Sequence, residues 1–336
     1  MKQFYYTAIL VFFVANIFAQ DIHFSQYYSA PLTVNPAQSG LFDGNYRIGL
    51  NYRTQWASVT VPYQTLSAFA DFNIHKQPYN SGYFGIGLLI IRDQAGDGEL
   101  SDTKVYGSFA YHLVLNKLRT MQISFGLQGG EVEETVDFSK LYFDDQWNDI
   151  TFDQSIPSGE NYTTSTVHYL DVNVGAMYTF SLPDVWSCYA GVGLYNLTQP
   201  HVTFYNSPNE LGMRPIIQGG VSISLGKNYE IYPSGIAMLE KGASEMLLGS
   251  MASYAPNPYS QSNQKFYLGA YLRTGDAGVI VGGYEVNNIR FLLNYDINFS
   301  QLVPASQSRG AFELSIIYIG SILKSPESII LPCPRF

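Results

Sequence analysis

Most of this chain alternates between apolar and polar residues with a period of two. In the stretch YRIGLNYRTQW at Tyr46–Trp56, every second residue from Tyr46 to Trp56 is mostly large and apolar. The residues between them are arginine, glycine, asparagine and glutamine. Ile289–Phe299 and His168–Phe180 repeat the pattern. Because successive side chains of a strand point to opposite faces, these stretches predict strands with one apolar and one polar face. Their length of about eleven residues is typical of a tilted strand that crosses a bilayer.

The pattern recurs along nearly the whole chain and predicts about fourteen strands. An even number is expected for a bacterial single-chain barrel. The predicted strands are Tyr46–Trp56, Tyr63–Ile74, Gly82–Ile91, Thr103–Leu115, Met121–Leu127, His168–Phe180, Val185–Asn196, Arg214–Leu225, Tyr229–Leu239, Ser244–Tyr254, Lys265–Arg273, Gly278–Glu285, Ile289–Phe299 and Ala311–Ile319.

A soluble β-sandwich also shows alternation, but its polar face meets water and carries many lysines and glutamates. Here the polar face consists mainly of Gly, Ser, Asn, Gln and Tyr, and charged residues make up 13% of the chain, about half the usual share of soluble domains. Aromatic residues gather near strand ends, as in the girdles of membrane barrels. We therefore predict an all-β fold, a transmembrane antiparallel up-and-down β-barrel of an outer membrane over residues 46–320. A soluble secreted β protein is the weaker alternative.

The two ends of the chain lack this period. Residues 1–19 combine one lysine with an apolar run from Phe4 to Phe18 and the small residue Ala19, which predicts a signal peptide cleaved after Ala19 and export to the outer membrane. Residues 20–45 are expected to plug the lumen or to lie beneath the barrel, and residues 321–336 to form a periplasmic tail. With both ends periplasmic, the odd-numbered connections are external, including the longest one, from about Glu131 to Val167.

The sequence lacks the motifs of common enzyme classes. It contains no P-loop, no HExxH and no GxSxG, so we expect no enzymatic activity and no cofactor. The five histidines are scattered, and no metal site is expected. The acidic stretch Asp144–Asp153 could bind calcium, but it lacks the glycine and the final glutamate of an EF-hand, and a solvated loop is the preferred interpretation. A net charge of −9 argues against nucleic acid as a partner.

Two groups of residues outside the strands are candidates for contacts. Phe143, Trp147 and Phe152 lie on the longest predicted external loop, where exposed aromatic side chains are typical of protein contact. Cys188 begins the seventh predicted strand and Cys333 lies in the tail, both on the periplasmic side. A disulfide between them is therefore allowed, although a strand cysteine is more often just a small apolar residue.

Charged residues on the polar faces predict what fills the lumen. They could line a solute pathway, or they could form ion pairs across the lumen, which we prefer because both signs occur. Closure of the barrel would place Arg53 and Glu313 on adjacent strands, but the sequence does not fix their register. The charges concerned are Arg47, Arg53, Arg273, Arg290, Asp296 and Glu313.

Several stretches resemble the PorP/SprF family of outer-membrane proteins of the type IX secretion and gliding-motility apparatus. They are DIHFSQYYSAPLTVNP at Asp21–Pro36, NYRTQW at Asn51–Trp56, and the block Tyr267–Tyr318 with LGAYLRTGD, NYDINFSQL and RGAFELSIIY. Motif positions in that block with no assigned role are Arg273, Asp276, Arg309 and Glu313.

The resemblance implies a barrel without enzymatic activity that docks, helps to export or anchors a large cell-surface adhesin through the adhesin's C-terminal sorting domain. It implies as partners that adhesin, other outer-membrane components of type IX secretion, and outer-membrane lipid. The alternative function is an outer-membrane channel or transporter for small or hydrophobic solutes.

Overall fold

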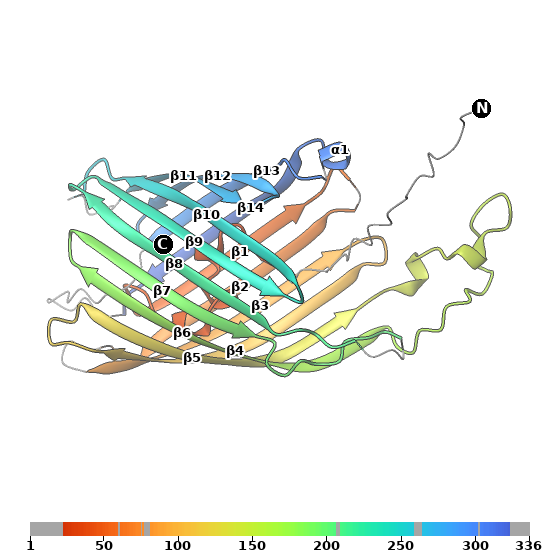
Figure 1. The fold of residues 1–336 in the computed structure, drawn as a ribbon, viewed down its shortest axis with the longest axis horizontal. Helices are drawn as coiled ribbons and strands as arrows, with labels where there is room; N and C mark the ends of the chain where they lie inside the picture. Colours follow the sequence, from red (N-terminus) through yellow and green to blue (C-terminus); the bar gives the residue numbers. More distant parts are fainter. Residues whose placement is uncertain are drawn as a thin grey trace, which may run out of the picture.

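The computed structural model describes residues 23–59, 61–74, 76, 81–205, 209–258, 264–301 and 303–322. Its main feature is a closed barrel of fourteen antiparallel strands, in which each strand pairs with its neighbours in the chain and β1 pairs with β14 (Figure 1). The strands are β1 (Tyr46–Gln55), β2 (Tyr63–Ile74), β3 (Gly82–Ala95), β4 (Leu100–Val114), β5 (Met121–Thr135), β6 (Thr166–Leu182), β7 (Trp186–Tyr195), β8 (Arg214–Leu225), β9 (Tyr229–Glu240), β10 (Ala243–Tyr254), β11 (Lys265–Arg273), β12 (Ala277–Val286), β13 (Ile289–Asn298) and β14 (Arg309–Gly320).

The alternation of exposure along most strands, together with closure of the sheet, confirms the predicted barrel. In β1, Ile48 and Leu50 point outward and are 44% and 48% exposed, whereas Arg47, Asn51 and Arg53 point into the lumen and are buried. A soluble sandwich would bury the apolar set and expose the polar one. An apolar outside and a polar inside suit a wall bathed in lipid.

All fourteen predicted strands are present, but several are longer than predicted. The largest difference is in β5, which continues from Leu127 to Thr135. Gly129, Gly130 and Glu131 break the apolar alternation there, so the sequence pattern ends before the strand does. Glu131 and its neighbour Glu133 have largely exposed side chains, which indicates that this part of the strand extends beyond the apolar band.

The connections divide the barrel into two unlike ends. The 30-residue connection between β5 and β6, residues 136–165, and the connection between β7 and β8 lie at what we call the loop end, on the right in Figure 1. The opposite turn end has short connections, such as residues 183–185 and 226–228, together with the longer 255–264 connection. A single α-helical turn, α1 (Val303–Ser306), precedes β14 at the loop end.

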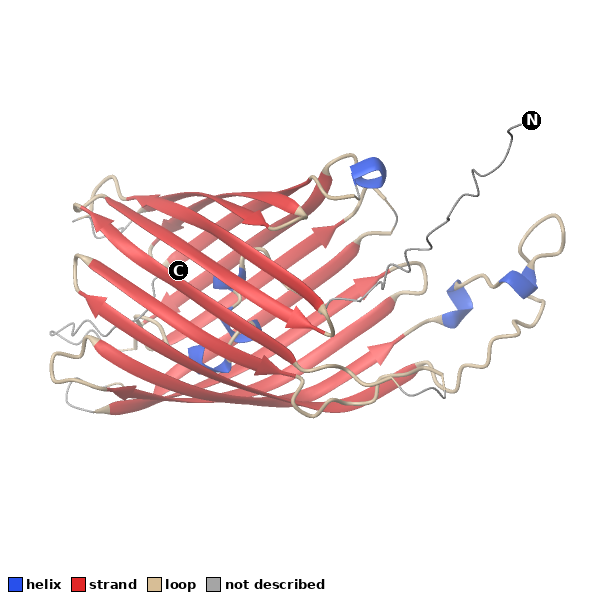
Figure 2. Cartoon of the chain, viewed as in Figure 1, coloured by secondary structure: helices blue, strands red, loops and turns tan. Residues whose placement is uncertain are grey.

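Residues 23–45 run inside the barrel from the loop end to the turn end. They contain three one-turn 3-10 helices, η1 (Tyr27–Ser29), η2 (Pro31–Thr33) and η3 (Pro36–Gln38), which are seen within the barrel in Figure 2. Nearly all of their side chains are buried. We call residues 23–45 the luminal segment. The predicted signal peptide, residues 20–22 and tail residues 323–336 lie outside the described residues.

None of the helices in the described part of the chain is long and apolar enough to cross a membrane.

Candidate functional site

A buried group of charges lies in the lumen near the loop end. Arg53 of β1 and Glu313 of β14 stand directly opposite each other in the strand register, and their side chains form an ion pair. Arg273 Nη2 lies 3.1 Å from Asp296 Oδ2, and Arg53 Nη1 lies 3.5 Å from the same oxygen. All four side chains are at most 4% exposed. We call these four residues the loop-end cluster.

The loop-end cluster holds the beginning of the luminal segment. The backbone N–H groups of Ser25 and Gln26 donate to the two carboxylate oxygens of Glu313, at 2.7 and 2.9 Å. The Ser25 hydroxyl donates to Asp296 Oδ2 at 2.8 Å and accepts a hydrogen bond from Arg53 at 2.9 Å. Because each buried charge has an opposite charge and hydrogen bonds, the cluster offsets the cost of desolvation. The luminal segment is therefore part of the charge network.

The structure brings together three of the four motif positions. Arg273 belongs to the loop-end cluster and also lies 3.2 Å from Asp276 Oδ2, just beyond the end of β11. Glu313 belongs to the same cluster. Arg309, at the start of β14, is exposed and lies outside it.

A second ion pair holds the other end of the luminal segment. Arg47 of β1 and Asp71 of β2 face each other in the register and form two hydrogen bonds of 3.0 and 2.8 Å. Arg47 also donates to the carbonyl of Gln38 at 3.2 Å, and Asp71 accepts from the N–H of Gly40 at 2.8 Å. The segment is thus tied to the wall at both ends.

Between these ends, glycines on the strands make room for the luminal segment. A Cβ atom on Gly85 of β3 would lie 1.8 Å from the carbonyl oxygen of Ser39, and one on Gly175 of β6 would lie 2.0 Å from Asn35 Oδ1. Asn35 donates 3.1 Å hydrogen bonds to backbone carbonyls on β6 and β7. The wall approaches the segment too closely for any larger residue at these positions.

Apolar side chains of the luminal segment pack against different parts of the wall. Tyr27 and Tyr28 join a large buried cluster on β7 to β13, Leu32 joins one on β2 to β5, and Leu41 packs with Met177 and Tyr189. The segment therefore contacts the wall around most of its circumference. The structure therefore favours the interpretation that the luminal charges form ion pairs over the interpretation that they line a solute pathway.

The loop between β5 and β6 carries the predicted aromatic residues. Trp147 and Phe152 are 48% and 44% exposed, and their ring centroids lie 5.1 Å apart in an edge-to-face arrangement. Tyr142 packs on Phe152 at 5.6 Å, and Ile150 is 85% exposed. Phe143, which follows Tyr142 in the chain, is half-buried. We call Tyr142, Trp147, Ile150 and Phe152 the loop tip.

Hydrogen bonds within the loop give the loop tip a defined shape. Gln146 is buried and bonds to the backbone of Phe143 and Ile156. Hydrogen bonds from Ser155 hold the pKa of Asp153 below its ordinary value, so this carboxylate stays charged. At the base of the loop, Phe138 stacks on Tyr162 with centroids 3.9 Å apart. The tip is thus a structured projection, visible at the far right of Figure 2.

The cysteine and metal predictions are only partly addressed by the described residues. Cys188 is half-buried, and the alternation in β7 places it on the outward face with Ala190 and Val192. Cys333 lies outside the described residues, so the disulfide remains a prediction. Within the described ranges, no three His, Cys, Asp or Glu side chains come together as a metal site.

Sequence reasoning missed the luminal residues that complete the network. Ser25, Gln26 and Asn35 lie in a segment without a period, so alternation could not place them. Asp71 was also missed. It occupies a luminal position in β2, and its place on the polar face of a predicted strand could have identified it as a luminal charge.

Several solved structures are similar to this chain. The toluene transporter TbuX of Ralstonia pickettii is 11% identical, with a TM-score of 0.50, and 86% of this chain and 92% of that chain are covered. The P. putida toluene transporter TodX is 9% identical, with a TM-score of 0.49 and coverage of 86% and 93%. A Pseudomonas aeruginosa FadL homologue is 10% identical, with a TM-score of 0.47 and coverage of 84% and 92%. Among curated proteins, none matches the chain in sequence.

The family comparison covers most of the chain, from the end of the predicted signal peptide to the last strand. Residues 16–318 match the family described as type IX secretion system membrane protein PorP/SprF. The match includes the luminal segment, the loop-end cluster and the loop tip. Together with the closed fourteen-stranded barrel, it shows that the chain is an outer-membrane β-barrel protein of the PorP/SprF family.

Proposed function

We propose that this chain docks a large cell-surface adhesin through the adhesin's C-terminal sorting domain and helps to export it or to anchor it. The observation that carries the proposal is a lumen occupied by the chain's own luminal segment, combined with a structured apolar loop tip outside the barrel. In such a barrel the partner would bind to the surface outside the lumen and would not pass through the lumen. The family membership supports a role in type IX secretion.

The loop tip is the proposed contact surface for the adhesin. Exposed aromatic side chains are enriched at the centres of protein interfaces, where they bury a large area at a low entropic cost. Trp147 and Phe152 pack on each other and are presented by a loop with internal hydrogen bonds. Phe143 is half-buried, and its backbone N–H donates to Gln146 within the same loop. Binding therefore requires little ordering of the tip.

The proposal also fixes the orientation of the barrel. Cleavage after Ala19 removes the signal peptide, and both ends of the barrel chain face the periplasm, which places the loop end outside the cell. Other type IX secretion components are the further partners. The protein itself has no enzymatic role and acts by binding.

The test compares surface adhesin in cells that produce different variants. The double variant Trp147→Ala/Phe152→Ala is expected to lower surface adhesin at least severalfold, nearly as much as loss of the whole protein, and to release the adhesin that copurifies with the barrel. The control is Val59→Ala, an exposed apolar residue elsewhere at the loop end. Unchanged surface adhesin in cells that lack the protein would refute the proposed function.

The second candidate is a channel or transporter for small or hydrophobic solutes. The likeness of the fold to TbuX, which is named as a toluene transporter, is the observation that favours it. The filled lumen weighs against it. A steady open pore formed by the intact protein in a planar bilayer would support the channel over the docking barrel.

A further inference from the structure

The loop end carries an open groove on the outer side of the barrel wall, which the adhesin proposal does not use. Its volume of about 570 Å³ lies within the range of roughly 300–1,000 Å³ that is usual for ligand sites. Arg92 and Gln94 of β3 and Ser101 of β4 line one side, and Asp137, Phe138 and Tyr162 of the β5–β6 loop line the other. We call it the outer groove.

The outer groove continues the lipid-facing surface of the barrel. Alternation along β3 places Arg92 on the same outward face as Leu88 and Ile90, which are 50% and 42% exposed. Gln94 follows on that face and pairs in the register with Ser101 of β4, so the polar surface extends across both strands. The groove therefore begins where the apolar band ends. A lipid whose acyl chains lie along Leu88 and Ile90 would hold its headgroup in the groove.

Arg92 provides the outer groove with an available cation. Its side chain is exposed and forms no ion pair or hydrogen bond with any described residue. In the register it faces Thr103 on β4, which carries no charge. A guanidinium is always charged and presents a planar fork of N–H donors that matches a phosphate. Just beyond the apolar band, this fork lies at the level at which a lipid carries its phosphate.

Two carboxylates that line the outer groove are already paired with a lysine. Lys140 Nζ lies 2.6 Å from Glu99 Oε1 and 3.8 Å from Asp137 Oδ2. Hydrogen bonds from Ser139 hold the pKa of Asp137 below its ordinary value, so Asp137 stays a carboxylate that can accept hydrogen bonds from hydroxyl groups. With Arg92, these groups carry two positive and two negative charges, so a small anion gains little overall. A ligand with both a phosphate and hydroxyl groups is favoured instead.

An aromatic pair adds an apolar face that suits a sugar ring. Phe138 and Tyr162 stack with ring centroids 3.9 Å apart and an angle of 8° between their planes, and Tyr162 is 42% exposed. The C–H groups on the face of a sugar ring pack favourably on the negative face of an aromatic ring. The outer groove thus combines a cation, hydrogen-bond acceptors and an apolar face.

We propose that the outer groove binds the phosphorylated sugar headgroup of lipopolysaccharide, the glycolipid of the outer leaflet. Its phosphate lies on Arg92, its hydroxyl groups donate to Asp137, and its acyl chains lie along Leu88 and Ile90. The inference rests on the proposed orientation, in which the loop end is outside the cell, but not on adhesin docking. The bound lipid contacts the base of the loop that carries the loop tip.

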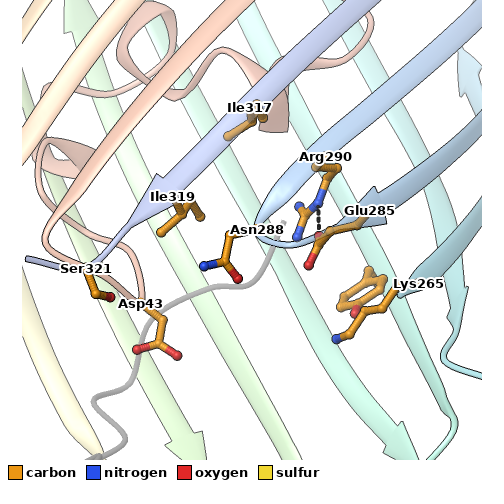
Figure 3. Close-up of a pocket in the computed structure, with 9 residues that line it drawn as sticks. Asp43, Lys265, Glu285, Asn288, Arg290, Ile317, Ile319 and Ser321 are labelled. Carbon is orange, nitrogen blue, oxygen red and sulfur yellow. Dashed lines mark hydrogen bonds and ion pairs between the residues drawn. The ribbon is translucent and has the colours of Figure 1, made fainter. Parts of the chain in front are cut away.

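A second cavity, at the turn end, lacks the two features that favour a lipid (Figure 3). It has a volume of about 470 Å³ and lies inside the lumen, so the wall separates it from the bilayer. Arg290 Nε lies 2.7 Å from Glu285 Oε2, and Lys265 Nζ lies 3.1 Å from Glu230 Oε2, so both cations are paired with carboxylates. This cavity therefore supplies a control at a charged site that a lipid headgroup does not reach.

Titration of the barrel with lipid A, the phosphorylated disaccharide anchor of lipopolysaccharide, tests the proposal. The mature protein is delipidated in detergent, and bound lipid A is measured by native mass spectrometry. Arg92→Gln is expected to weaken binding about tenfold, because a charge-assisted bidentate contact is lost. The controls are Arg309→Gln, which changes an exposed arginine of the loop end outside the groove, and Lys265→Gln in the turn-end cavity. Both should bind lipid A like the parent protein.

Removal of the phosphate makes the result specific. Dephosphorylated lipid A should bind the parent protein about tenfold more weakly than lipid A, whereas Arg92→Gln should bind the two almost equally. Heat-modifiable migration on a gel verifies that each variant still forms the barrel. Equal affinities of Arg92→Gln and Arg309→Gln for lipid A, or binding of phosphatidylglycerol as tight as that of lipid A, would overturn the proposal.

Labelling of intact cells separates this inference from the proposed function. In a Cys188→Ser/Cys333→Ser background, Ile150→Cys at the loop tip is expected to react with a membrane-impermeant maleimide, because Ile150 is 85% exposed. Absence of labelling would refute the orientation and with it the lipopolysaccharide site. Because the lipid A titration contains no adhesin, a negative result there would overturn the lipid site alone and leave adhesin docking standing.

Discussion

Glu313 connects the wall of the barrel to the luminal segment. Its carboxylate accepts two backbone hydrogen bonds from the luminal segment and pairs with Arg53, and only 1% of the Glu313 side chain is exposed. Removing one partner of a buried ion pair costs far more than an exposed pair contributes, because the remaining charge stays desolvated. Glu313 is therefore a main attachment of the luminal segment at the loop end.

Replacing Glu313 by alanine should loosen the luminal segment. Arg53 would lose its closest acidic partner and keep only Asp296, at 3.5 Å, and two N–H groups would lose their acceptors, so we expect a loss of about 3–5 kcal/mol in the free energy of unfolding. The measurement is urea unfolding in lipid vesicles, together with the rate at which protease cuts the segment. Glu133→Ala, which removes a half-exposed glutamate, serves as the control. Identical curves for the two variants would contradict the assigned role.

At the residue scale, the sequence predicted which charges face the lumen but not what they bind. Alternation placed Arg53 and Glu313 on polar faces, and barrel closure placed them on adjacent strands. Their contact depends on the shear of the closed sheet, which no local pattern encodes. Their contacts with Ser25 depend on a segment without regular structure, whose path is set only by the lumen around it.

At the scale of the element, each strand is specified by its two unlike faces. Fourteen strands were predictable because lipid outside and polar contacts inside impose a strict period of two. The same rule predicted too short a strand for β5, because outward-facing residues beyond the membrane no longer need to be apolar. Glu131 and Glu133 occupy such positions. Loop conformation was not predictable, because hydrogen bonds such as those of Gln146 connect residues with no periodic relation.

A charge on the outward face of a strand should destabilise the barrel. Leu50 lies near the middle of β1 and points outward, so Leu50→Arg places a charge in hydrocarbon at a cost of about 2–4 kcal/mol. Urea unfolding in vesicles measures this loss. Leu118→Arg is the matched control, because Leu118 lies in a turn and is already 82% exposed. An equal, small effect of both variants would contradict a lipid-facing position for Leu50.

The fit between strand and luminal segment is testable at a single glycine. Gly85→Ala would bring a methyl group within 1.8 Å of the Ser39 carbonyl, so either the strand or the segment must shift, at a cost of about 1–3 kcal/mol. Faster proteolysis of residues 23–45 is the expected signature. Gly107→Ala on the neighbouring strand has open space and should change nothing. If both variants behave like the parent protein, the segment does not pack as described.

At the scale of the whole molecule, the barrel has two unlike ends and a continuous filling between them. The loop end presents the aromatic loop tip and the buried charges that hold residues 25 and 26. The turn end has short connections and the Arg47–Asp71 pair. The same luminal segment is bonded to the wall near both ends.

This architecture predicts how conductance depends on the luminal segment. A fourteen-stranded barrel is wide enough to hold the segment and its side-chain contacts, so removal of the segment leaves an aqueous space. In planar bilayers, the intact protein should show little steady conductance, and deletion of residues 23–42 should produce a stable open pore. Asp43, Gly44 and Asn45 are retained because Asn45 bonds to Gly320 and Ile322 at the turn end.

Glu313→Ala provides an intermediate case between the intact and the deleted protein. If the loop-end cluster holds the segment in place, this variant should open intermittently, with the conductance of the deletion during each opening. Glu133→Ala should remain closed. If the intact protein already conducts as much as the deletion variant, the luminal segment does not block the lumen. The docking proposal would then lose its main supporting observation, and the channel alternative would be favoured.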